Sequence, residues 1–463
     1  MDRRQAIRSF CECSTIQVWN RAAMAKKRGH SSHWLNQRWW RFAVAEWVGL
    51  ILSFLAVVLI FCLFFIRRHT LEYHLEHTFT VRDPEFFGSA LALSDPVPIG
   101  GNKIELLANG DEYFPAMLKA IGAAQKTVNF ASYILHSDEI GRQFRDAFCE
   151  RAKAGIEVRL LLDGIGSGWS LDNSDVRMMR DAGCKVAYYH PTASLRVDRT
   201  NRRSHRRVLV IDGKVAFTGS AGFSRKWGGH AQDKDHWRDT QVRIEGPLVA
   251  KLQWAFEEHW VKTFGETLSG AAQFPQLADA GDLKAQLIAS TSFSMAPIPL
   301  LQATVFAAAE KHIWSTNPYC TPTDDQVELL VKAVQRGVDV RLLLPGINND
   351  QPLTKSAGRA AYGRMLEGGV KIFEYQPTMI HTKSMVVDGL FSMLGSSNLD
   401  ARSSEINEEL DVAVYDENFG RQMEAVFEKD LHESREYTLQ DFKNRSWWER
   451  TTEWLMLPFR SQL

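Results

Sequence analysis

An internal repeat constrains the fold of this chain more than any other feature of its 463 residues. The stretch GIEVRLLLDG at 155–164 returns as GVDVRLLLPG at 337–346, and AGCKVAYYHP at 182–191 returns as GGVKIFEYQP at 368–377. The two offsets are 182 and 186 residues, whereas the units of a solenoid recur every 20–50 residues or so. The repeat therefore predicts two similar domains, not a solenoid.

Each copy of the repeat has the order strand, helix, strand. The first copy shows a strand pattern at 128–135, an amphipathic helix pattern at 141–155 and a buried strand pattern at 156–163. The second copy shows the same order at 312–319, 325–337 and 338–345. This alternation is typical of βαβ units. We therefore expect an α/β protein in which two α/β/α domains, each with a mostly parallel sheet, form a pseudo-dimer.

The composition of the segments around the repeats gives a domain division. Residues 266–282 are mostly small or polar and include a proline, which is typical of a linker. The complete division is a basic N-terminal tail at 1–41, a transmembrane anchor at 42–68, a connector at 69–100, a first domain at 101–265, the linker at 266–282, a second domain at 283–445 and an aromatic C-terminal tail at 446–463.

The transmembrane expectation comes from Trp47 to Ile66, WVGLILSFLAVVLIFCLFFI, a run without a charge. As a helix it would span about 30 Å, the thickness of a bilayer core. Tryptophans cluster before it, as in an interfacial aromatic belt, and Arg67 and Arg68 follow it. More Lys and Arg flank its N-terminal side than its C-terminal side, which favours a single pass with the large domain outside.

The formal net charge is zero but unevenly distributed. Residues 1–41 hold nine Lys and Arg against two acidic residues, so the rest of the chain is net negative. A nucleic-acid-binding domain would be basic, and we expect no nucleic-acid partner. The six cysteines match no zinc or disulfide spacing, and the chain shows no carboxylate cluster or phosphate loop for a metal-bound nucleotide. We expect neither metal nor cofactor, and the sequence does not give the oligomeric state.

A second repeated pattern carries the chemistry. HTKSMVVDGLFSMLGSSN at 381–398 is nearly repeated by SHRRVLVIDGKVAFTGSAG at 204–222. Each reads as a β-hairpin with an Asp-Gly turn, at Asp212 and at Asp388. Residues two apart on a strand share a face, so the pairs that face the same way are His205 with Arg207, His381 with Lys383, and Ser396 with Asn398. The turn aspartates have the opposite parity, which favours a structural role, although both belong to the repeated motif.

Two domains packed about a pseudo-two-fold axis would join these half-sites. One histidine can attack phosphorus while the other protonates the leaving group, and Arg207 and Lys383 can stabilise the charge that develops on a phosphate. Ser220, Ser396 and Asn398 are candidates for phosphate binding or support. An acidic side chain usually orients such a histidine, and the candidates are Asp239 and Glu409.

The paired motif resembles that of the phospholipase D superfamily, where HxKx4Dx6GSxN occurs twice. Within it, the stretches NPYCTP (317–322), GSSNLDARSSEINEE (395–409) and HWRDTQVRIEGPLV (236–249) resemble the bacterial cardiolipin synthases. The resemblance covers roughly residues 100–460. It implies a site made of His205, Arg207, Asp212, His381, Lys383 and Asp388 that works through a covalent phosphohistidine, with His205 as nucleophile and His381 as general acid.

The resemblance also implies a substrate and a place in the cell. Two molecules of phosphatidylglycerol, an anionic phospholipid, would give cardiolipin and glycerol at the bacterial inner (cytoplasmic) membrane. The alternatives are a hydrolase of the phospholipase D type, a nuclease, or an inactive membrane protein. Two departures from the family pattern bear on whether the protein is inactive: Arg207 replaces Lys, and Gly222 replaces Asn.

Two further segments have alternative interpretations. Residues 194–207 contain six arginines, and they form either an electropositive lip for lipid headgroups or a solvated basic loop. The C-terminal tail, with Trp447, Trp448 and Trp454, forms either an interfacial helix or a helix packed on the second domain by its apolar side.

Overall fold

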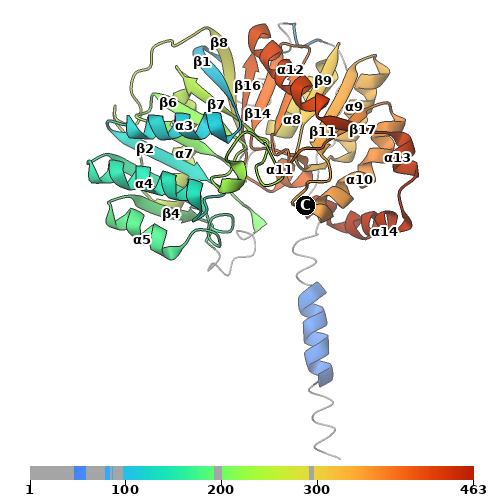
Figure 1. Cartoon of the computed structure of the whole chain (residues 1–463), viewed down its shortest axis with the longest axis horizontal. Helices are drawn as coiled ribbons and strands as arrows, with labels where there is room; N and C mark the ends of the chain where they lie inside the picture. Colours follow the sequence, from blue (N-terminus) through green and yellow to red (C-terminus); the bar gives the residue numbers. More distant parts are fainter. Residues whose placement is uncertain are drawn as a thin grey trace, which may run out of the picture. The chain divides into compact units, whose positions relative to one another are not determined.

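The structure is a computed structural model that describes residues 46–58, 79–83, 86, 97–191, 201–290 and 297–462 (Figure 1). The chain forms two compact units, Met1–Thr70 and Leu71–Leu463. In the first unit, residues 46–58 are helical and expose large apolar side chains such as Trp47 and Phe54. No helix within the described ranges is long and apolar enough to cross a membrane. The basic tail at 1–41 and the part of the predicted span after residue 58 lie outside those ranges.

The second unit contains both copies of the repeat (Figure 1). The elements of the first half are β1 (Ile99–Ala108), α3 (Gly110–Gly122), β2 (Thr127–Ser132), α4 (Glu139–Lys153), β3 (Glu157–Asp163), α5 (Asn173–Asp181), β4 (Lys185–Tyr189), β5 (Val208–Ile211), β6 (Val215–Gly219), the 3-10 turn η1 (Arg225–Trp227), β7 (Thr240–Glu245) and α7 (Val249–Phe264). The predicted linker covers the interval between α7 and the next strand.

The second half follows the same order, with the short strands β10 and β15 and the helix α11 inserted, and adds a C-terminal extension. Its elements are β8 (Leu283–Ala289), α8 (Pro297–Ala308), β9 (His312–Thr316), β10 (Cys320–Thr321), α9 (Asp324–Gln335), β11 (Asp339–Pro345), α10 (Pro352–Glu367), β12 (Lys371–Tyr375), β13 (Ser384–Val387), β14 (Phe391–Gly395), β15 (Leu399–Asp400), α11 (Ala401–Glu405), β16 (Leu410–Tyr415), α12 (Glu417–His432), β17 (Ser434–Tyr437), α13 (Leu439–Lys443), α14 (Trp447–Met456) and η2 (Leu457–Gln462).

The described strands of the two halves form one continuous sheet. Its order is β17-β12-β11-β9-β13-β14-β16-β8-β1-β7-β6-β5-β2-β3-β4. The halves join where β1 pairs with β8. Only β2–β3, β3–β4, β9–β11 and β11–β12 are parallel pairs in this sheet, and the other neighbours are antiparallel. The expectation of mostly parallel sheets was therefore wrong: each βαβ unit is parallel, but the hairpin strands and the joining strands run antiparallel to it.

Helices cover both faces of the sheet, as expected for α/β/α layers. In the first half, Phe130 and Leu160 pack with residues of α4, while Ala131 and Leu161, which have the opposite parity, pack with residues of α7. In the second half α9 and α10 cover one face and α12 the other. The cluster under α7 also contains residues of α12 and of strands from both halves. The two repeats therefore share a core as well as a sheet.

The two predicted hairpins are present. Val208 pairs with Thr218 and Ile211 with Val215 in the first, and Ser384–Val387 pair with Phe391–Leu394 in the second. Asp212 and Gly213 both have positive φ, 53° and 64°, and Asp388 and Gly389 have 54° and 65°. A positive φ at both central residues defines the type I′ turn that Asp-Gly favours. The turns fix the strand register and thereby the face on which the residues before each hairpin lie.

Candidate active site

The histidine and the cation of each half lie immediately before the first strand of a hairpin. His205 and Arg207 precede β5, and a guanidinium nitrogen of Arg207 lies 3.0 Å from Nε2 of His205. His381 and Lys383 precede β13, and Nζ of Lys383 lies 3.2 Å from Nε2 of His381. All four side chains are buried. The predicted pairing of His with its cation is therefore present in both halves, with the cation at the Nε2 side of the ring.

The other ring nitrogen of each histidine binds a carboxylate from the opposite half. Nδ1 of His205, in the first half, donates to Glu409 at 2.9 Å, and Nδ1 of His381, in the second half, donates to Asp239 at 2.8 Å. A proton on Nδ1 leaves Nε2 with a lone pair. The carboxylates thus select the tautomer in which Nε2 can attack or accept a proton.

Backbone pairing between the halves produces this exchange. Ser204 and Glu408 form a parallel bridge, so the next residues, His205 and Glu409, lie side by side. Arg238 and Ile380 form the equivalent bridge beside Asp239 and His381. The same contact therefore occurs twice, once in each direction, and joins the two half-sites into one site.

Glu409 is held by the loop between β14 and β16. Its carboxylate accepts hydrogen bonds from the Ser396 hydroxyl at 2.5 Å, from Ser403 at 2.8 Å and from the Asn407 amide at 3.2 Å. Asn398 contacts Ser403 and not the carboxylate. Ser396 and Asn398, predicted to bind or support phosphate, thus support the carboxylate directly and through Ser403.

Asp239 is held by a different set of groups. The Ser220 hydroxyl donates to one carboxylate oxygen, and the indole N–H of Trp227 donates to the other at 2.9 Å. The backbone N–H of Thr240 adds a third bond at 2.7 Å. Ser220 and Ser396 therefore have equivalent roles in the two halves, whereas Trp227 has no counterpart among the contacts of Glu409.

Burial and the neighbouring cations set the protonation states. Burial and then Lys383 lower the pKa of His381 to about 3, against the opposing effect of Asp239, and burial and then Arg207 lower that of His205 to about 4. Burial and then Arg207 lower the pKa of Lys383 to about 7. Burial alone would raise the pKa of Glu409, but its bonds to His205 and the serines lower it. The cation of the other half also lowers the pKa of each histidine: Lys383 acts on His205, and Arg207 acts on His381. This is expected of a single shared site.

Comparisons with known proteins identify the family of the chain. The sequence profile of the family described as "Cardiolipin synthase, PLD-like domain" matches residues 117–260 and 303–431, which contain both half-sites. The chain belongs to this family. It is 32% identical over 356 residues to a cardiolipin synthase of Alkalihalophilus pseudofirmus, covering 76% of this chain and 70% of that protein. It is also 32% identical over 379 residues to cardiolipin synthase A of Pseudomonas syringae pv. syringae, covering 79% and 77%.

One solved structure supports the fold. The phosphatidylserine synthase of Haemophilus influenzae superimposes with a TM-score of 0.61 at 14% identity, covering 78% of this chain and 95% of that one. At that identity the likeness concerns the fold alone.

The two turn aspartates of the family motif do not enter the site. The Asp212 carboxylate accepts backbone N–H bonds from Gln125, Lys126 and Thr127, at the start of β2. Asp388 accepts the equivalent bonds from Glu310, Lys311 and His312, at the start of β9. Each histidine lies just before the start of its strand, β5 or β13, whereas each aspartate lies just after the end of the same strand. The assignment of Asp212 and Asp388 as catalytic is corrected: they fix the strand starts, as their parity indicated.

Gly222 differs from the family pattern for a steric reason. A Cβ at this position would lie 2.9 Å from two ring atoms of Trp227 and 3.1 Å from Cβ of Ile134. The Trp227 ring thus takes the space that a side chain at 222 would need, and its N–H binds Asp239. Trp227 therefore supplies a hydrogen-bond donor in the half-site that lacks the family asparagine.

Two arginines of the basic segment 194–207 are buried and paired with acidic side chains. Arg203 is buried and paired with Asp163 at 2.8 Å. Arg206 is buried and paired with Glu258 at 2.8 Å. Neither can form an exposed lip or a solvated loop, because both charges are neutralised inside the protein. Arg196 and Arg199 lie outside the described residues.

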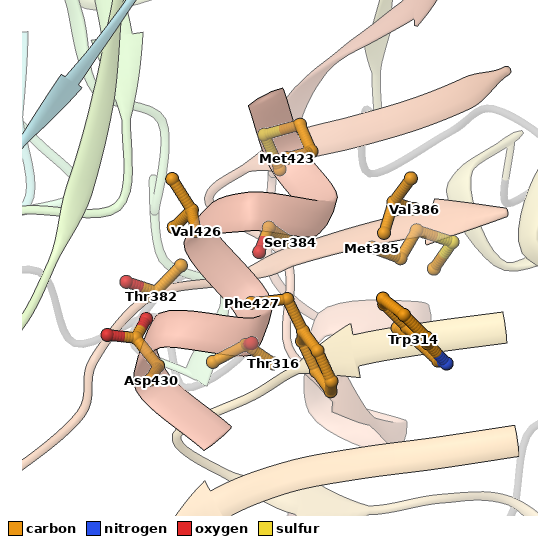
Figure 2. A pocket seen from close by; sticks show the side chains of 10 residues that line it. All are labelled: Trp314, Thr316, Thr382, Ser384, Met385, Val386, Met423, Val426, Phe427 and Asp430. Carbon is orange, nitrogen blue, oxygen red and sulfur yellow. The ribbon is translucent and has the colours of Figure 1, made fainter. Parts of the chain in front are cut away.

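A small pocket lies next to β13 but is separate from the site. Figure 2 shows its lining between β13 and α12, with Thr382, Ser384, Phe427 and Asp430 among the labelled side chains. Thr382 stands between His381 and Lys383 in sequence, so it has the opposite parity. Asp430 is bound to Arg238 at 2.9 Å. The pocket therefore belongs to the packing behind the site.

Three supporting residues were missed from the sequence: Trp227, Ser403 and Asn407. Ser403 and Asn407 lie in the quoted stretch between Asn398 and Glu409, where hydroxyl and amide side chains are frequent. Trp227 lies only five residues after Gly222, the last residue of the first motif. An indole N–H is a plausible donor to a buried carboxylate, but nothing in the sequence pairs it with Asp239.

Proposed function

We propose that this protein is a phosphatidyltransferase of the cardiolipin synthase type, which converts two molecules of phosphatidylglycerol into cardiolipin and glycerol. The observation that carries the proposal is the crossed pair of dyads, His205 with Glu409 and His381 with Asp239. Two equivalent histidines in one site can divide nucleophilic attack from proton transfer.

In the first half-reaction, Nε2 of His205 attacks the phosphorus of phosphatidylglycerol. A phosphorus–nitrogen bond forms, and the bond from phosphorus to the departing glycerol oxygen breaks. Nε2–H of His381 gives its proton to that oxygen, so glycerol leaves as a neutral alcohol. The bound anion favours this protonated state of His381, since a nearby negative charge raises the pKa of an imidazole.

In the second half-reaction, a glycerol hydroxyl of another phosphatidylglycerol attacks the phosphohistidine. Nε2 of His381, now neutral, accepts the hydroxyl proton, and the bond from phosphorus to His205 breaks. The product is cardiolipin, and both histidines return to their starting states. The roles of the two histidines follow the family resemblance, because the site itself is nearly symmetric.

Arg207 and Lys383 are suited to stabilise the transferring phosphoryl group. Their nitrogens lie at the Nε2 atoms, where the phosphorus must approach. The equatorial oxygens of phosphorus gain negative charge in the transition state, and fixed cations in a buried site stabilise that charge. Arg207 carries the same charge as the Lys of the family pattern, so the first half-site still supplies a fixed cation for the phosphoryl group.

The proposed enzyme acts at the bacterial inner membrane. The uncharged run Trp47–Ile66 would anchor it as a single pass with the catalytic unit outside. The exposed apolar side chains of helix 46–58 suit a lipid environment.

A product analysis tests this function. The full-length protein is incubated with phosphatidylglycerol vesicles, and glycerol, cardiolipin and phosphatidic acid are measured by mass spectrometry, with His381→Ala as control. The proposal predicts cardiolipin and glycerol in equal amounts, both lost in the variant. Phosphatidic acid and glycerol without cardiolipin would make the protein a hydrolase instead.

A further inference from the structure

The C-terminal helix α14 is turned with its polar side inward. Glu453 is its buried residue and pairs with Arg445 at 3.0 Å, while Glu449 pairs with Arg359 of α10 at 3.0 Å. Figure 1 shows α14 lying alongside α10. Amphipathic helices of soluble proteins normally bury the apolar side. The helix α14 therefore packs on the second domain, as one alternative expected, but not by its apolar side: the ion pair of Glu449 with Arg359 joins it to α10.

The outward side of α14 is aromatic. Trp447, Trp448 and Trp454 are 63%, 64% and 69% exposed, and Leu455 and Phe459 are also exposed. The rings of Trp447 and Trp448 stack with centroids 3.8 Å apart. Large exposed apolar patches mark interaction sites, and Trp in particular favours the boundary between lipid headgroups and acyl chains.

The charges around the patch favour an anionic lipid surface. Residues 443–462 contain four basic side chains and two acidic ones. Glu449 is paired with Arg359, Glu453 with Arg445 and Arg460 with Asp324, so that Lys443 and Arg450 are the basic side chains of this segment that form no ion pair within the described part of the chain. Anionic membranes attract such basic segments. A protein partner with an apolar groove would not require this positive excess.

The patch is also connected to the active site. The turn η2, which follows α14, contacts α11. The guanidinium of Arg402 in α11 donates to the carbonyl of Gln462 at 3.1 Å. The next residue, Ser403, binds Glu409. A surface that contacts lipid through α14 would thus lie in the same compact unit as the site, linked to it by these contacts.

We propose that the outer face of α14 and η2, formed by Trp447, Trp448, Trp454, Leu455 and Phe459, docks the catalytic unit on the interface of an anionic phospholipid bilayer. This inference rests on the proposed action on phospholipid. It adds a second membrane contact, separate from the N-terminal anchor, that holds the catalytic unit against the surface from which its substrate comes.

A depth measurement on the full-length chain tests the docking independently of turnover. An environment-sensitive fluorescent amino acid replaces Trp454 in one protein and Trp254, an exposed tryptophan of α7, in a matched control. Both are reconstituted in vesicles of phosphatidylglycerol and phosphatidylcholine with brominated acyl chains, which quench nearby fluorophores. Docking predicts loss of about half the emission at 454, because the probe reaches the acyl boundary, and little loss at 254. Equal quenching at both positions, or none at 454, would overturn it.

A kinetic comparison separates docking from the proposed function. The variant Trp447→Gln/Trp448→Gln/Trp454→Gln should raise the apparent KM for phosphatidylglycerol in vesicles about tenfold, since interfacial binding scales with buried apolar area. Its kcat in detergent micelles should remain that of the wild type, as should that of Trp254→Gln in both systems. An unchanged KM in vesicles would contradict docking. Quenching at 454 without any transfer activity would contradict the proposed function alone.

Discussion

His205 and Glu409 lie 204 residues apart in the chain, yet Nδ1 of His205 donates to the Glu409 carboxylate at 2.9 Å. His381 and Asp239 make the reciprocal contact. Each histidine is therefore oriented by the half of the protein to which it does not belong, and neither repeat contains a complete dyad. Both dyads therefore require the two repeats to pack against each other, as they do in the shared sheet and core.

The variant Glu409→Gln should lower kcat by about 10²- to 10⁴-fold, because an amide in place of the carboxylate no longer selects the tautomer or stabilises the imidazolium. Asp239→Asn should have a comparable effect on the other histidine. Cardiolipin formation in phosphatidylglycerol vesicles measures both. A loss of less than threefold or so, in a folded variant, would show that the carboxylates do not orient the histidines.

Asp388→Asn is the matched control for these carboxylate variants. In the wild type, the Asp388 carboxylate binds three backbone N–H groups at the start of β9 and no group of the site. The loss of charge-assisted hydrogen bonds should lower the free energy of unfolding by about 1–3 kcal/mol, with kcat unchanged at temperatures where the variant is folded. Thermal unfolding and initial rates on the same sample distinguish the two effects. A large fall in kcat without destabilisation would return Asp388 to the catalytic set.

Arg207→Lys should keep kcat within about threefold of the wild type, whereas Arg207→Met should lower it at least about 100-fold. In the other half, Nζ of Lys383 reaches both the His381 carbonyl and Nε2 of its ring, which shows that an ammonium fits this position. Steady-state kinetics on phosphatidylglycerol check the pair. If the Lys variant were as inactive as the Met variant, the planar guanidinium itself would be required.

Trp227→Phe should lower kcat about tenfold, because Asp239 loses a buried N–H donor while a smaller aromatic ring remains in the core. Gly222→Asn alone should destabilise the protein, since its Cβ would press on the Trp227 ring. The double variant Gly222→Asn/Trp227→Ala removes this overlap, so adding Gly222→Asn should destabilise Trp227→Ala less than it destabilises the wild type. If Trp227→Phe had wild-type kcat, the indole N–H would have no role in positioning Asp239.

The buried Lys383 predicts a rise in stability between pH 7 and pH 9. Burial and then Arg207 lower its pKa from 10.5 to about 7, so above pH 7 the unfolded chain binds more protons than the folded protein. Stability then increases with pH, by at most about 1.4 kcal/mol per pH unit for one group. The increase should be absent in Lys383→Met. Thermal unfolding at pH 7 and pH 9 measures this change in stability. An equal change with pH in the wild type and in Lys383→Met would contradict a lowered pKa of Lys383.

The sequence predicted the parts of this protein better than their arrangement. The Asp-Gly turns and the strand parity of His381 and Lys383 depend on neighbours in sequence, and local patterns carry that information. Asp239 and Glu409 are candidates because such a histidine needs an acidic partner, and no local pattern pairs either of them with a particular histidine. The antiparallel majority of the sheet does not appear in a βαβ pattern, because hydrophobic periodicity identifies strands but not their partners. The crossed dyads arise from two backbone bridges between distant segments.

Other features escaped prediction because they depend on side-chain packing. Arg203 and Arg206 look like part of a basic loop in sequence, but each finds a buried acidic partner. For the helix α14 the sequence left two alternatives open, an interfacial helix and a helix packed by its apolar side, and the exposure of the tryptophans together with the ion pairs of Glu449 and Glu453 favours the first.

The central claim, that two histidines of one crossed site divide attack from proton transfer, is tested most directly with phosphatidyl-p-nitrophenol. This substrate has a leaving group that needs no protonation, so His381→Gln should release about one equivalent of nitrophenol in a burst and then stall as the phosphohistidine. His205→Gln should give no burst. A burst in His205→Gln and none in His381→Gln would reverse the roles, and the absence of a burst in both variants would contradict a covalent intermediate.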